Sequence, residues 1–68
     1  MLLLKLVSKK PATKPGYSDL GFEAINSNGE SRDFWPEGEG YGSLVMVDVI
    51  PAAAAHFEIG KKYKVVFA

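Results

Sequence analysis

Apolar and polar residues alternate with a period of two along several short stretches of this chain, as they do in half-buried β-strands. Leu2, Leu4 and Leu6 fall on one face of an extended segment, which predicts a first strand over Leu2–Val7. Two prolines follow closely and leave too little room for a stable helix. These prolines and a Pro-Gly step predict a loop over Ser8–Gly16.

A second strand is expected over Tyr17–Asn26, where Leu20 and Phe22 share a face. The Asn-Gly step at residues 28–29 is a strong hairpin signal, because both residue types tolerate the positive φ angles of a type I′ turn. The pattern therefore predicts that Glu30–Trp35 returns as an antiparallel strand and ends at the following proline.

The segment Leu44–Ile50 is apolar on both of its faces. Strict alternation places Leu44 and Met46 on one face and Val45, Val47 and Val49 on the other. A strand of this kind is usually central in a sheet or covered on both sides. Because a short chain has little material to cover a second face, the segment also predicts a partner.

The remaining elements are short. Pro51 suits the first position of a helix, and the alanines after it favour one to two helical turns over Pro51–Phe57. Gly60 predicts a turn into a last strand over Tyr63–Phe67. We therefore expect a single all-β domain over residues 1–68, with one short helix. Its architecture should be a four- to five-stranded antiparallel barrel or sandwich.

Length and composition limit how such a domain can be stabilised. The chain has 68 residues, 47% of them hydrophobic, and no cysteine. A domain of this size buries only about 60% of its unfolded surface, and no disulfide can add to its stability. A single histidine without thiols cannot complete a structural zinc site. We expect the chain to associate with itself or with a larger protein assembly.

The formal net charge is zero, but the charges are segregated. Residues 1–18 and 59–68 carry lysines and no acid, whereas residues 19–58 carry eight acids and one arginine. Basic ends with exposed aromatics allow an alternative function, single-stranded nucleic-acid binding by an oligonucleotide-binding type of small barrel. The candidate contacts for this alternative are Lys9, Lys10, Lys14, Trp35, Lys61 and Lys62.

No motif in the chain indicates an enzyme. His56 is the only histidine, and the sequence provides no nucleophile or orienting group for it. Glu37 and Glu39 lie on a glycine-rich loop, which would hold a carboxylate pair poorly and lacks the spacing of a phosphate-binding or calcium loop. We expect no catalytic residue, no metal and no cofactor.

The eight aromatic residues are numerous for the length of the chain. Alternation places Phe22, Tyr63 and Phe67 in the core, whereas Trp35 and Tyr41 flank the loop and should be the most exposed. Aromatic and apolar residues at the surface are typical of protein interfaces. The candidate protein interface is Leu44, Val45, Val47, Val49, Trp35 and Tyr41.

The second half of the chain carries a recognisable series of motifs. These are Tyr41-Gly42-Ser43-Leu44, then Pro51-Ala52-Ala53, then the stretch from Phe57 to Phe67 that contains Gly60-Lys61-Lys62-Tyr63. Over residues 34–67 it resembles small β proteins of tailed bacteriophages and prophages, which have no established activity. It departs from them at Ile50, where that group tends to have a capping asparagine.

This resemblance implies a phage-type protein, such as a virion component, a decoration protein or an accessory factor. It also allows a third function, inhibition of a host enzyme, in which the acidic middle segment would mimic nucleic acid. It implies a location in the cytoplasm of a bacterial host or in the virion. The apolar start at Met1–Leu4 is interrupted by Lys5 and lacks a cleavage site, so we expect neither a signal peptide nor a membrane association.

Overall fold

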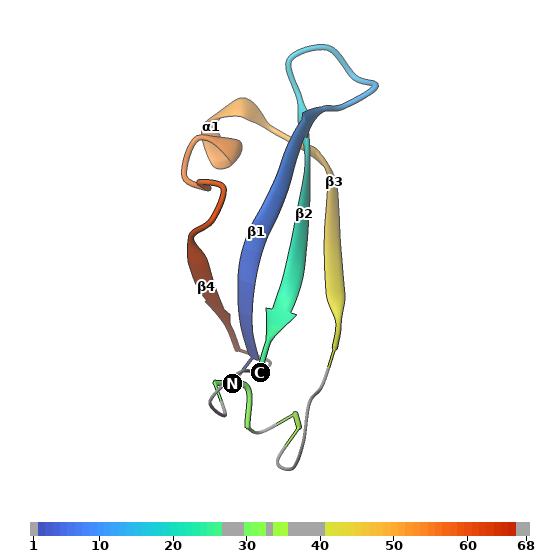
Figure 1. Ribbon diagram of the computed structural model, residues 1–68. Coiled ribbons are helices and arrows are strands. Elements are labelled where there is room, and N and C mark those ends of the chain that lie inside the picture. The colour runs from blue at the N-terminus through green and yellow to red at the C-terminus, as the bar shows by residue number, and fades with distance from the viewer. Residues whose placement is uncertain (1, 27–29, 33, 36–40, 67–68) are drawn as a thin grey trace.

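The computed structural model describes residues 2–26, 30–32, 34–35 and 41–66. Four strands and one short helix form a small globule (Figure 1). The elements are β1 (Leu2–Pro11), β2 (Ser18–Ile25), β3 (Ser43–Val49), α1 (Pro51–Ala54) and β4 (Lys62–Val65). The expected fold class, all-β with one short helix, is confirmed.

All four strands belong to one antiparallel sheet in the order β3-β2-β1-β4. Strands β3 and β4 therefore lie at opposite edges, and the chain passes from one to the other through α1 (Figure 1). Within the described ranges these two edges are not paired with each other, so the sheet is open. Helix α1 begins at Pro51 without a side-chain cap on Ile50, and it ends after one turn.

The core lies on one face of the sheet. Leu6 pairs with Phe22 across β1 and β2, and Lys9 pairs with Leu20 further along. Leu6 and Leu20 are completely buried, as alternation predicts. The core consists of Leu4, Leu6, Leu20, Phe22, Val49 and Ala54, with Leu2, Ala24, Ala53, Phe57, Tyr63 and Val65 packed against it. The second face of the sheet has no such covering layer among the described residues.

Three aromatic rings join the crossover segment to the sheet. The ring of Phe22 meets Phe57 at 5.8 Å and Tyr63 at 6.2 Å between centroids, both edge to face. The Phe57 and Tyr63 rings are 5.0 Å apart. Edge-to-face pairs of this kind contribute beyond the area they bury. The Tyr63 hydroxyl also accepts a hydrogen bond from the Glu58 N–H at 2.8 Å, which fixes the turn before β4.

The first strand is longer than predicted. It continues to Pro11, which pairs with Ser18, so the loop between β1 and β2 covers only residues 12–17. Proline is tolerated here because β4 pairs only with Leu2–Lys5, which leaves the other side of Pro11 without a strand that needs its N–H.

The expected strand over Glu30–Trp35 is wrong. The described residues of this segment form turns, in which the Ser31 carbonyl accepts hydrogen bonds from the N–H groups of Phe34 and Trp35. Its backbone groups are satisfied locally, and β3 takes the place beside β2 instead. The Asn-Gly step at residues 28–29 lies outside the described residues.

The expectation that Leu44–Ile50 is central in the sheet or covered on both sides is also wrong, because β3 is an edge strand and its residues from Ser43 to Asp48 are exposed. Its alternation breaks at a β-bulge. Met46 pairs with Leu20 and Val49 pairs with Ser18, so Val47 and Asp48 together lie opposite one residue of β2. Asp48 has a φ of 56°, which aspartate tolerates better than most residues. The bulge turns Val49 to the core face, where only 9% of it is exposed.

The bulge places Val47 and Val49 in different environments, although strict alternation would put them on the same face. We therefore expect them to contribute differently to stability. Val49→Ala should lower the free energy of unfolding by about 2 kcal/mol, because it removes buried methyl groups. Val47→Ala, the matched control, should change it by less than about 0.5 kcal/mol, because surface substitutions rarely do more. Denaturant unfolding at high dilution measures both values. Equal effects would show that the bulge does not form.

Candidate protein-interaction site

The outer edge of β3 presents backbone groups that no described strand pairs with. The Gly42 carbonyl accepts the Ala24 N–H at 2.8 Å, so the backbone groups of residue 42 point toward β2. In an antiparallel ladder these groups point alternately to the two sides of a strand. Leu44 and Met46 therefore direct their N–H and C=O groups toward β2, and Ser43 and Val45 direct theirs away from the sheet.

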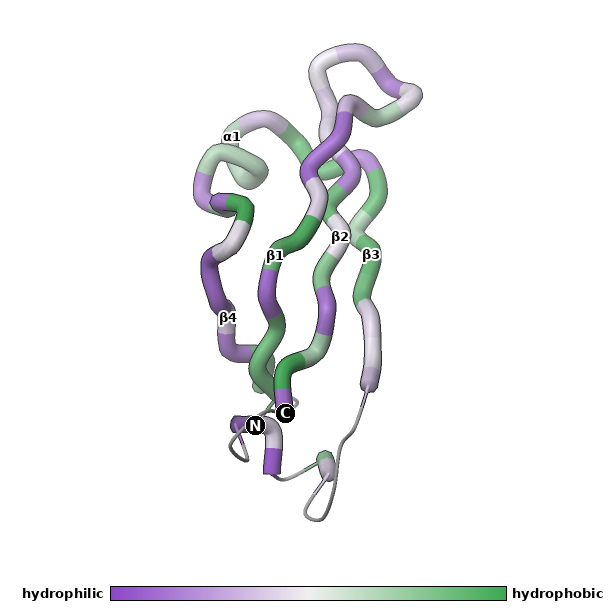
Figure 2. The backbone as a smooth tube through the Cα atoms, in the orientation of Figure 1, coloured by the Kyte–Doolittle hydropathy of each residue, from purple (hydrophilic) through white to green (hydrophobic). Residues whose placement is uncertain are grey.

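The side chains along this edge are apolar and exposed on both faces. Val45 and Val47 are 64% and 65% exposed on the open face. Leu44 and Met46 share the core face with Phe22 and Leu20 and are still 41% and 37% exposed. Figure 2 shows the contrast with the opposite edge, since most of β3 is coloured hydrophobic and most of β4 hydrophilic. Strand edges with this character favour pairing with another chain.

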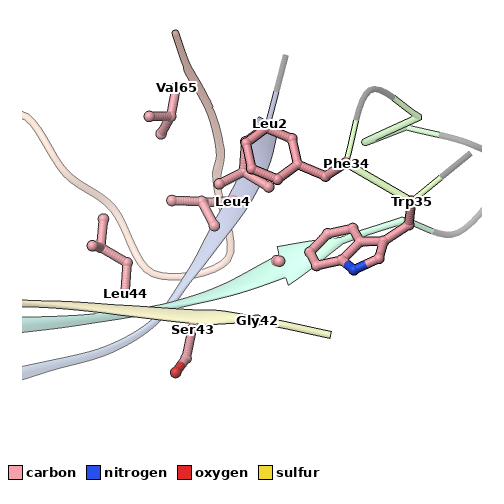
Figure 3. A pocket seen from close by; sticks show the side chains of 9 residues that line it. Leu2, Leu4, Phe34, Trp35, Gly42, Ser43, Leu44 and Val65 are labelled. Atoms are coloured by element: carbon pink, nitrogen blue, oxygen red, sulfur yellow. The ribbon is translucent and has the colours of Figure 1, made fainter. Parts of the chain in front are cut away.

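A cleft of about 450 Å³ adjoins β3 on the core face. It lies at the open end of the core, where Leu4, Leu44 and Val65 point into it from three strands (Figure 3). The residues around it are Leu2, Leu4, Ala24, Phe34, Trp35, Gly42, Ser43, Leu44 and Val65. The described residues of its walls carry no charged side chain, so this part of the cleft suits apolar groups better than a polar substrate.

Phe34 and Trp35 form an aromatic wall of the cleft. The turn that carries them is held in place by Ser31, which is completely buried. The Ser31 hydroxyl donates to the Ile25 carbonyl and accepts the Leu3 N–H at 3.0 Å. Asn26 completes the arrangement, because its side chain accepts the Ser31 N–H at 3.2 Å and donates to the Trp35 carbonyl at 3.2 Å. The turn carrying the wall is therefore tied to the ends of β1 and β2.

The residues predicted as an interface are only partly brought together. Leu44, Val45 and Val47 lie on the exposed edge, and Trp35 lines the cleft beside them. Tyr41 is 75% exposed just before β3. Val49 belongs to the core. Sequence reasoning missed Met46, which contributes to the exposed edge, and Ser31, whose role no sequence signal indicated.

The candidate nucleic-acid contacts are dispersed, and most of their lysines have partners within the chain. Lys9 donates to the carbonyls of Ala54 and Phe57 at 2.8 and 3.1 Å. Lys14 lies 4.6 Å from the centroid of the Tyr17 ring. Lys61 forms an ion pair with Glu58, and Lys62 forms one with Glu30. Lys9, Lys14, Lys61 and Lys62 thus each contact a group of the chain itself.

Other chemistry is not concentrated anywhere in the described part of the chain. His56 is exposed at the end of the helical turn. The searched residues contain no group of three or more His, Cys, Asp or Glu side chains able to hold a metal ion. None of the helices among them is long and apolar enough to cross a bilayer. Comparison with known proteins found no matching family model, curated protein or solved structure.

Lys9 and its neighbour Lys10 provide a test of whether these lysines serve the fold or a ligand. Lys9→Ala should lower the free energy of unfolding by about 1 kcal/mol, because two carbonyls lose a charged donor. The matched control Lys10→Ala, whose side chain makes no such contact with the described residues, should change the free energy of unfolding by less than about 0.5 kcal/mol. Thermal or denaturant unfolding measures both. Indistinguishable stabilities would show that the Lys9 contacts do not support the fold.

Proposed function

We propose that this chain is a non-enzymatic assembly module that acts through protein–protein contacts made by β3. The observation that carries the proposal is an edge strand whose outward backbone groups have no partner among the described residues and whose side chains are apolar on both faces. Natural sheets usually protect such edges with charges, prolines or a covering segment. Ser43–Val47 contains no charge or proline, and no described segment covers this edge, so it suits a partner strand.

The bulge limits the part of β3 with which a partner strand could pair, and the cleft lies beside that part. Asp48 breaks the regular strand beyond Val47, and its N–H donates to a carboxylate oxygen of Asp19 at 3.1 Å. Pairing is thereby confined to Ser43–Val47. A strand added there would border the apolar cleft through Leu44. Backbone hydrogen bonds would supply affinity, and the alternate side chains would supply specificity.

The biological setting of this activity rests on the resemblance to small proteins of tailed bacteriophages. A virion component, a decoration protein or an accessory factor would each need stable contacts with repeated protein surfaces, which an edge strand can provide. The nucleic-acid alternative is less well supported, because Lys9, Lys14, Lys61 and Lys62 are engaged within the chain. Of the eight acids on which the inhibitor alternative depends, Asp33, Glu37 and Glu39 lie outside the described residues.

The proposal predicts that a charge on the β3 edge prevents association. Light scattering on the wild-type chain should give a mass above that of the monomer that rises with concentration. Val47→Lys should stay monomeric, because a lysine at the edge opposes pairing. Val66→Lys is the matched control, since Val66 is 79% exposed beyond the end of β4.

The control variant should associate like the wild type. A wild-type chain that is monomeric at every concentration, with Val47→Lys indistinguishable from it, would contradict self-association through β3. Equal loss of association in both lysine variants would show that the effect is one of general charge and not of the edge.

A further inference from the structure

The sheet has two edges, and they differ in charge. By the same alternation that orients β3, the residues of β4 whose backbone groups point away from β1 are Lys62 and Lys64, because the Leu6 N–H bonds to the Lys61 carbonyl at 3.1 Å. Their side chains are exposed on the open face. Over Ser43–Val47, β3 carries no charge at all.

This difference selects among the ways in which two copies could pair. Two β4 edges would bring lysines opposite lysines, which is destabilising. A β3 edge on a β4 edge would set those lysines beside Val45 and Val47, and it would leave one edge of each kind open for further addition. Pairing of two β3 edges places apolar side chains opposite apolar side chains. The resulting dimer leaves no β3 edge open for a third chain.

We infer that the partner of β3 is a second copy of this chain, paired antiparallel about a two-fold axis at Val45. The inference rests on the proposed function and specifies its partner. In this register Val45 lies opposite Val45 of the second copy, and Ser43 lies opposite Val47 of the second copy. The residues whose backbone groups face outward are thus directly opposed, as a ladder requires.

The side chains also match in this register. On the open face, the two Val45 side chains meet at the centre, and each Val47 meets a Ser43. On the core face, Leu44 of each copy meets Met46 of the other, beside the cleft. No charged side chain enters the contact between Ser43 and Val47, and the bulge at Asp48 sets its limit. The product is one continuous sheet of eight strands, twice the four of a single chain.

Cysteine scanning tests this register cleanly, because the chain has no cysteine of its own. At Val45→Cys the two Cα atoms would be about 5.5 Å apart in a directly opposed pair, within the range that a disulfide spans. Val47→Cys is the matched control, with the same residue type, face and exposure. Its two Cα atoms would be separated by four residues along the strands, about 14 Å, which no disulfide can bridge.

We expect mild oxidation to convert Val45→Cys to a covalent dimer on a denaturing gel and to leave Val47→Cys monomeric. The double variant Ser43→Cys/Val47→Cys should form the dimer again, since those positions are opposed. Equal cross-linking of Val45→Cys and Val47→Cys would overturn the register.

The oxidation experiment also separates this inference from the proposed function. If the wild type associates in light scattering while none of the cysteine variants forms a disulfide dimer, β3 has another partner geometry and the two-fold pairing is wrong. If the wild type remains monomeric and no variant cross-links, self-association through β3 fails together with the register.

Discussion

In the described part of the chain, other segments cover only one face of the sheet. The crossover from β3 through α1 to β4 lays Ala54 and the ring of Phe57 over the core residues of β1 and β2. Burial of this face supplies the main stabilising term, because apolar area removed from water is the dominant favourable contribution to folding. The described residues leave the other face and both sheet edges open to solvent or to another protein, and the consequences differ between the two edges.

The bulge at Asp48 divides β3 into a part that packs into the core and a part that lies exposed at the surface. Val49, beyond the bulge, turns inward and closes the core beside α1. The residues before it stay in regular pairing with β2 and expose two apolar rows. A strand that followed strict alternation would have left Val49 outside and the core one side chain smaller. The same irregularity thus completes the fold and limits the exposed edge.

Local patterns predicted most of the fold. Alternation identified Leu4 and Leu6 in β1 and Leu20 and Phe22 in β2, and Pro51 marked the start of α1. These features depend on nearest neighbours along the chain. The strand expected over residues 30–35 was wrong because strand order depends on contacts between distant parts of the chain. No local pattern indicates that β3, and not this segment, pairs with β2.

The candidate site was predicted only in part, because it also depends on contacts between distant parts of the chain. The apolar character of Leu44, Val45 and Val47 is evident in the sequence, but whether such a strand is central or at an edge depends on the strand order. The role of Ser31 could not be predicted, since it arises from contacts with Leu3, Ile25 and Asn26 that only the folded chain brings together. The spacing from Met46 to Val49, with an aspartate between them, was the one available signal for the bulge.

Amide hydrogen exchange at Val45 tests the central claim most directly. Its N–H points away from β2, where no described strand pairs with it, whereas the Leu44 and Met46 amides face β2. We expect the Val45 amide to be protected in concentrated solution and to exchange rapidly on dilution, while the Leu44 and Met46 amides remain protected in both. A Val45 amide that exchanges rapidly at every concentration would contradict pairing of β3 with a second chain.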